Sequence, residues 1–304
     1  MRQGTLRGLV AGAIAISLAG CATSSSPPPK RADAGGRGGA HAVVDVGLAS
    51  QAGAFEAYTR KAAGIDATFA NPAEIGARLR TAAGYEPRQL EASMIAYAAL
   101  AAMQEPRFVQ AVRGGGRDLG RRLVADPDSA LALTGGPAAA ARASAALASR
   151  GEALAGAGAR VKKTSYSIQH QAWSRARVPN APQRLAAVKQ AASYRADPAD
   201  RARLTAAIAE GGRRGGTSPV VSRGLAVAAL TLLGQDSAAR NLMSDRRAGQ
   251  CLRSAKLNYH QCLAASGTHY EDIYCLGVHA MTDPGQCVVE ATKQPRTTRR
   301  ASLG

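Results

Sequence analysis

Four cysteines and three histidines lie close together near the C-terminal end of the chain. The cysteines are Cys251, Cys262, Cys275 and Cys287, and the pattern His260-x-Cys262 followed by Cys275-x-x-x-His279 offers two sulfur and two imidazole ligands. Such a set can bind zinc or, with the histidines unused, form two disulfides. A spacing of two residues turns His260 and Cys262 about 200° apart on a helix, which disfavours joint coordination. We therefore predict two disulfides, histidines that pack or cap at the surface, and no metal site.

Two helices joined by a tight turn must position these cysteines. Gly267 is expected to end a first helix covering about residues 248–266. Thr268 and Glu271 have the spacing of a capping box, which predicts the start of a second helix. The segment is therefore expected to fold as an antiparallel helical hairpin.

The geometry of that hairpin selects the disulfide pairing. Cys251 and Cys262 are separated by about 16 Å along one helix, whereas a disulfide requires Cα atoms within about 7 Å. Across the hairpin, an inner pair Cys262–Cys275 and an outer pair Cys251–Cys287 face each other. The segment Asp283-Pro284-Gly285 should kink or restart the second helix, which weakens the prediction of the outer pair. In architecture alone, this arrangement resembles the twin-cysteine helical hairpins of several small proteins.

The rest of the ordered chain is predicted to be helical because of its helix-start signals. A capping residue directly precedes proline at Asn71, Asp126, Asp197, Ser218 and Asp283. Strand-like runs are confined to residues 43–46 and 219–221. No repeat period holds along the chain. We predict an all-α fold: an irregular multi-helix array over residues 42–244, with the four-cysteine hairpin of residues 245–292 packed on it.

A basic segment between residues 153 and 196 contains no acidic residue. Its cations are Arg160, Lys162, Lys163, Arg175, Arg177, Arg184, Lys189 and Arg195, and the single tryptophan, Trp173, lies among them. If one helix continues through Ala176, Tyr166 and Trp173 flank its apolar face near Lys162 and Arg177. Lys162, Arg175, Arg177 and Trp173 are then candidates for binding an acidic polymer or lipid headgroups. The alternative is that both aromatic residues lie at the edge of the core, with the charges pointing into solvent.

The N-terminal end has the layout of a secretory leader. Arg2 and Arg7 precede a short apolar run that ends in Leu18-Ala19-Gly20-Cys21. The run is too short to span a bilayer, which requires about 20 apolar residues. Its ending resembles the lipobox of bacterial lipoproteins. The resemblance implies removal of residues 1–20 as a signal peptide and lipidation of Cys21, and Ala22 after it points to the outer membrane, facing the periplasm.

Low-complexity segments flank the predicted helical part. Residues 21–41 are rich in Pro, Gly and Ser and are expected to form a disordered tether behind the lipidated cysteine. Residues 293–304 contain four cations and no acid, which predicts a frayed basic tail. The tail could contact anionic headgroups or remain unbound.

The chain has a formal net charge of +18. Nucleic acid is the usual partner of so basic a protein, but an exported lipoprotein does not meet it. The expected partners are the membrane, through Cys21, and an anionic envelope lipid or polymer or another envelope protein. A basic surface that only aids solubility is an equal alternative.

Motifs for catalysis are lacking in the sequence, which has no nucleophile elbow, zinc-protease motif or phosphate loop. We predict a non-enzymatic structural, adaptor or binding role in the envelope, with no cofactor. The alternative is a hydrolase-like envelope enzyme that uses histidine and carboxylate residues of the hairpin. His269 beside Glu271 and Asp272 is the titratable cluster that would serve it.

Overall fold

The computed structural model describes residues 46–192, 195–213 and 217–294 of the chain. The predicted signal peptide, Cys21, the tether and the basic tail from residue 295 onward lie outside these residues. Within them the fold is all-α, as predicted, and the β structure is limited to one isolated bridge between Arg177 and Thr268. None of the described helices combines the length and apolar character needed to cross a membrane.

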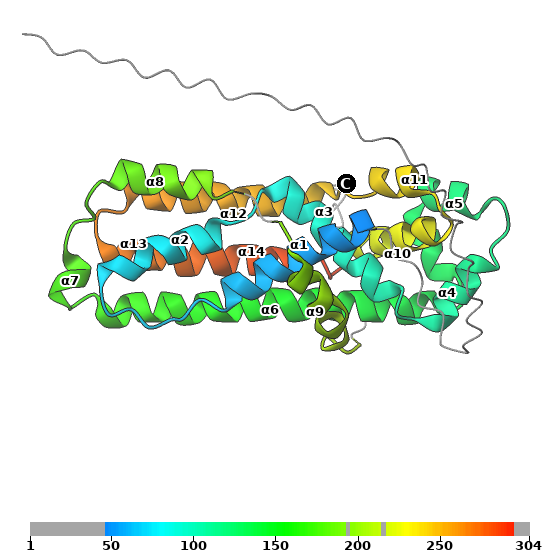
Figure 1. Ribbon diagram of the computed structural model, residues 1–304, viewed down its shortest axis with the longest axis horizontal. Coiled ribbons are helices and arrows are strands. Elements are labelled where there is room, and N and C mark those ends of the chain that lie inside the picture. The colour runs from blue at the N-terminus through cyan, green and yellow to red at the C-terminus, as the bar shows by residue number, and fades with distance from the viewer. Residues whose placement is uncertain (1–45, 193–194, 214–216, 295–304) are drawn as a thin grey trace, which may run out of the picture. The chain divides into compact units, whose positions relative to one another are not determined.

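The helices of the described part are, in chain order, α1 (Val46–Ala63), η1 (Pro72–Glu74), α2 (Ile75–Ala83), α3 (Pro87–Ala102), α4 (Pro106–Arg113), α5 (Leu119–Ala125), η2 (Pro127–Ala132), α6 (Gly136–Ile168), α7 (Ala172–Arg175), α8 (Ala181–Gln190), α9 (Pro198–Ala209), α10 (Pro219–Leu232), α11 (Asp236–Asn241), α12 (Arg246–Ala265), α13 (His269–Cys275), η3 (Leu276–Thr282) and α14 (Asp283–Glu290). Figure 1 shows their arrangement. The elements η1 and η2 are 3₁₀ helices, and η3 is a π-helix.

Most of the helices that were predicted to start with a side-chain cap do so. Backbone N–H groups at helix starts donate to the side chains of Asn71, Asp126, Asp197 and Ser218. Gly234, with φ of +72°, follows the end of α10. The prediction for Asp283 was wrong, because this residue continues a helix that arrives from η3.

Helix α3 lies at the centre of the core. Nearly all of its residues from Leu90 to Ala102 are buried, and it packs against α1, α6, α10 and α12. Small side chains allow close approach: a Cβ atom built on Gly224 of α10 would lie only 2.7 Å from the Cβ of Ala98. An alanine-rich core with few aromatic residues therefore packs through short distances between helix backbones.

The hairpin packs along α6 through glycines on both sides. Gly151 and Gly158 of α6 meet Gly285 and Gly277, and a Cβ built on any of the four would lie within 2.8 Å of opposing backbone. The two glycines of α6 are seven residues apart, whereas those of the hairpin are eight apart. The wider turn of the π-helix η3 lies between the latter pair and absorbs the extra residue.

The hairpin of residues 245–292 shares one core with the array before it. Tyr259 of α12 is fully buried and donates a hydrogen bond to the carbonyl of Leu79 in α2, at 3.1 Å. The continuous cluster of buried apolar residues extends from Leu48 to Val288. The boundary predicted at residue 245 coincides with Asp245, the N-cap of α12. The packing of the core continues across it.

Candidate functional site

Both predicted disulfides are present. Cys251 and Cys287 have Cα atoms 5.7 Å apart, and those of Cys262 and Cys275 are 5.6 Å apart. The first helix of the hairpin, Arg246–Ala265, matches its predicted range within two residues. The four sulfurs are bonded in two pairs, so the sulfur ligands of the alternative zinc site, Cys262 and Cys275, are not free. Among the described residues there is no other group of side chains suited to hold a metal ion.

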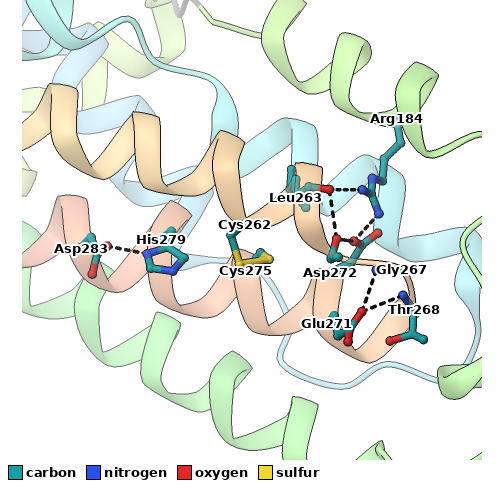
Figure 2. The surroundings of a disulfide bond; sticks show 11 residues. Arg184, Cys262, Leu263, Gly267, Thr268, Glu271, Asp272, Cys275, His279 and Asp283 are labelled. Carbon is teal, nitrogen blue, oxygen red and sulfur yellow. Dashed lines mark hydrogen bonds and ion pairs between the residues drawn. A yellow bond between two sulfur atoms is a disulfide. The ribbon is translucent and has the colours of Figure 1, made fainter.

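The second helix of the hairpin does not break at Pro284, contrary to the expected kink or restart. The π-helix η3 leads directly into α14, and Thr282 donates a hydrogen bond of 2.8 Å to the carbonyl of Gly277. A wider turn before proline leaves room for a ring that would otherwise clash with the preceding turn. As a result His279 and Asp283 face each other, with Nδ1 and Oδ2 2.8 Å apart (Figure 2).

The carboxylate cluster at the hairpin turn holds the turn in place. Glu271 Oε2 accepts hydrogen bonds from the backbone N–H groups of Gly267 at 2.7 Å and Thr268 at 2.9 Å. Although partial burial opposes the change, these bonds lower the pKa of Glu271 below its ordinary value, so it is ionised at neutral pH. This is the glutamate contact of the predicted capping box.

Asp272 forms the buried centre of the same turn. Its carboxylate accepts a hydrogen bond of 2.6 Å from the Ser266 hydroxyl and pairs with Arg184 of α8, which also donates to the carbonyl of Leu263 (Figure 2). Burial raises the pKa of Asp272 despite these partners. Arg184 therefore belongs to the structural core and fixes α8 against the hairpin, although the sequence places it in the basic segment.

The histidines of the hairpin have separate environments. His269 is buried, and desolvation lowers its pKa. His260 has a pKa lowered to about 4, first by burial and then by Lys256 and Lys189, so both side chains are neutral at pH 7. Of the three histidines in the described part of the hairpin, only His279 forms an ion pair or hydrogen bond with a carboxylate, that of Asp283.

A groove of about 340 Å³ opens between the end of α6 and α12–α13, beside the inner disulfide. Its lining comprises Ser165, Tyr166, Gln169, Cys262, Ala265, Ser266, Tyr270, Glu271, Tyr274 and Cys275. Three tyrosines and one carboxylate give it both apolar and polar walls.

Aromatic side chains follow the contact between α6 and the hairpin from the groove onward. The ring centroids of Tyr166 and Tyr274 are 6.0 Å apart, and those of Tyr274 and His279 are 6.5 Å apart. Lys162 Nζ lies 6.0 Å from the centroid of Tyr274. A row of aromatic rings thus connects the groove with the His279–Asp283 pair.

The structure distributes the predicted anion-binding residues over separate elements. Helix α6 ends at Ile168, so Trp173 lies on the short helix α7 and Arg177 in the segment after it, and not on one continuous helix. The buried Ser174 hydroxyl donates to the carbonyl of Ile168, which satisfies one of the carbonyls left free where α6 ends. Trp173 is partly buried against the core, which agrees with the alternative that this residue lies at the core edge.

Part of the basic segment nevertheless contacts the hairpin turn. Arg177 forms the isolated bridge with Thr268, and the N–H of Val178 donates to the carbonyl of Gly267 at 3.0 Å. Arg175 and Arg177 are exposed beside this turn, whereas Lys162 of α6 lies over Tyr274, farther along the hairpin. Binding of an anion by these residues remains a prediction.

The groove and the His279–Asp283 pair were not predicted from the sequence. Two spacings in the sequence could have indicated them. Tyr270 and Tyr274 are four residues apart, as are His279 and Asp283, and residues at this spacing are neighbours on one face of a helix. The proline at 284 argued against a helix over the second pair. The contribution of Tyr166 depends on which helices pack together, and the sequence does not encode this locally.

Comparison with known proteins adds no family to this geometry. No family model, curated protein or solved structure matches the chain.

Proposed function

We propose that this chain is a lipid-anchored protein of the bacterial envelope, attached through Cys21 at the outer membrane and facing the periplasm. The observation that carries the proposal is the pairing of all four later cysteines in two disulfides. Disulfides persist in oxidising compartments and are rare in the cytosol. This supports the export that residues 1–21 predict.

Within the envelope, the helical unit acts as an adaptor or binding protein and not as an enzyme. The carboxylates of the hairpin turn, Glu271 and Asp272, are engaged with backbone amides, Ser266 and Arg184. His269, the base of the predicted catalytic cluster, is buried with a lowered pKa. These contacts support a structural role for the cluster.

The acidic partner of this adaptor is recognised at the hairpin end. Arg175 and Arg177 are exposed there and form no ion pair among the described residues. Cosedimentation with isolated cell-wall material and with lipopolysaccharide tests this role. Charge reversal at Lys162, Arg175 and Arg177 should release the protein from the pellet, whereas an unchanged pellet would contradict a role for these cations.

Native mass spectrometry under non-reducing conditions tests the anchor and the compartment together. The protein extracted from its own membranes should lack residues 1–20, carry lipid on Cys21 and be lighter than its reduced form by four hydrogens. A Cys21→Ala variant should carry no lipid. A mature chain with free thiols or without lipid would contradict the proposal.

A second candidate, an envelope hydrolase, is favoured by one observation, the His279–Asp283 pair. A carboxylate that holds Nδ1 orients the imidazole so that Nε2 can accept a proton from water or a substrate. Turnover of envelope glycans or peptides that is lost in both His279→Gln and Asp283→Asn would replace the adaptor proposal. Equal background activity in the wild type and both variants would support the adaptor proposal.

A further inference from the structure

The walls of the hairpin groove suit a ligand with one apolar face and a polar edge. Tyr166 is 51% exposed although its ring lies against Tyr274. With Tyr270, these rings present apolar faces that also carry hydroxyl groups. A pyranose ring has the matching structure, because its C–H groups form a face and its hydroxyl groups form an edge.

The polar groups of the lining complement such an edge. Glu271 is ionised, so its carboxylate accepts hydrogen bonds from hydroxyl groups, while the Gln169 amide both donates and accepts them. The hydroxyls of Ser165 and Ser266 already donate within the protein, to the carbonyl of Lys162 and to Asp272. Glu271 and Gln169 are therefore the groups that would orient a sugar.

The groove is held in shape before any ligand binds. The disulfide Cys262–Cys275 is part of its wall, and the buried pair Arg184–Asp272 fixes the hairpin turn beside it. A site that is already ordered loses little conformational entropy on binding. This favours recognition of a weakly interacting group such as a single sugar ring.

The charges around the groove point to an acidic glycan. Lys162 lies over Tyr274, and Arg175 is exposed and forms no ion pair among the described residues. An acidic peptide would bring carboxylates close to Glu271 inside the groove, where like charges repel. A sugar ring brings hydroxyl groups to Glu271 and leaves its carboxylate substituent outside, near the cations.

We propose that this groove binds the acidic amino-sugar residues of the cell-wall glycan, with the ring against Tyr166 and Tyr274 and the carboxylate directed to Lys162. The assignment rests on the proposed envelope function, because only a chain facing the periplasm meets this polymer. It adds to that function a specific occupant and the residues that hold it.

Binding of peptide-free glycan chains prepared from peptidoglycan tests the assignment. The full lipidated chain in detergent is titrated by calorimetry, with chito-oligosaccharide as the uncharged control of the same amino-sugar backbone. The acidic glycan should bind about tenfold more tightly than the control, a difference that added salt reduces. Equal affinity for both glycans would contradict the charge recognition.

Three variants of α6 locate the site. Tyr166→Ala and Lys162→Gln should each weaken binding of the acidic glycan about tenfold. Lys163→Gln removes the exposed charge next to Lys162 in α6, whereas Lys162 is the lysine that lies over Tyr274, so this variant should change the affinity less than about twofold. Tyr166 is half exposed, so its removal is expected to leave the fold intact, and an unchanged melting temperature verifies this.

Other outcomes overturn the groove assignment without touching the proposed function. Full affinity in Tyr166→Ala would place the glycan elsewhere. Binding of an acidic peptide or of lipopolysaccharide micelles in place of the glycan would assign the surface to another partner. A chain that carries its lipid and both disulfides and yet binds no glycan would leave the envelope anchor standing and refute the site.

Discussion

At the scale of single residues, two cations, Lys256 and Arg184, hold elements of the fold together. Lys256 is only 6% exposed, and its Nζ donates to the carbonyls of Ala83 and Tyr85 and lies 4.5 Å from the Tyr85 ring centroid. Ala83 ends α2, where carbonyl groups lack partners within the helix. Desolvation lowers the pKa of Lys256 to about 8, while the charge of Glu86 opposes the shift.

This lowered pKa predicts a rise of stability with pH. The unfolded chain holds the proton of Lys256 up to about pH 10.5, whereas the folded chain releases it near pH 8. Between these values the unfolded state binds more protons, so the free energy of unfolding should increase as the pH rises. Urea unfolding at pH 7, 8 and 9 should give a larger increase for the wild type than for Lys256→Met.

The Lys256→Met variant is the control because it keeps every other titrating group. Tyr58, Tyr85, Tyr97 and Tyr259 have raised pKa values and lower the stability above about pH 10 in both proteins. The difference between the two curves therefore isolates Lys256. Parallel curves would show that this lysine titrates normally.

The second cation, Arg184, is paired with the buried carboxylate of Asp272. Asp272→Asn keeps the shape of the side chain but leaves the guanidinium of Arg184 without its counter-charge, so we expect a loss of about 3–5 kcal/mol. Asp118→Asn is the matched control, because Asp118 pairs with Arg121 at an exposed position and should cost less than about 1 kcal/mol. Denaturant unfolding measures both, and equal costs would contradict a structural role for Asp272.

At the scale of elements, the contact between α6 and the hairpin depends on matched glycines. Gly158 faces Gly277, and Gly151 faces Gly285, with opposing backbone atoms where a side chain would lie. The π-helix η3 brings the hairpin glycines into register with those of α6. Pro284 is tolerated in a continuous helix for the same reason, since the wider turn precedes it.

Alanine substitutions in α6 test this contact. A Cβ at Gly158 would lie 2.5 Å from the carbonyl oxygen of Gly277, so Gly158→Ala should destabilise the fold by about 1–3 kcal/mol. Gly156 lies in the same helix, and its nearest neighbour would be Arg160 Nη1 at 3.8 Å, so Gly156→Ala should stabilise by about 0.5–1 kcal/mol. Thermal unfolding of the two variants should shift in opposite directions. A shift of the same sign and size would show that helix propensity alone determines the effect.

At the scale of the whole described unit, the hairpin and the preceding array form one core. Helix α12 packs against α3 and is joined to α2 by the hydrogen bond from Tyr259 to Leu79, and α14 packs against α6. We expect a single cooperative unfolding transition despite the predicted boundary at residue 245. Trp173 fluorescence reports the hairpin end and far-UV ellipticity reports all helices, so the two signals should have the same midpoint. Two separated midpoints would indicate that the hairpin unfolds as an independent domain.

Local sequence patterns predict much of the fold. Asn71, Asp197 and Ser218 start helices because a capping side chain and a following proline act within one turn. The disulfide pairing also follows from the sequence, because two helices joined at Gly267 can bring only certain cysteines within bonding distance. Asp283 is the exception, since its helix begins earlier and the cap signal has no role there.

By itself, the sequence determined the all-α class, the helix starts, the hairpin and its disulfides, because each depends on contacts between near neighbours or on a fixed helix geometry. Only the tertiary structure decided that α6 ends before Trp173, that Arg184 is buried against Asp272, and that Tyr166 and Tyr274 form one groove. These features join residues about 90 to 110 positions apart or depend on where the chain turns. Packing between distant helices fixes them, and such packing has no local signature in the sequence.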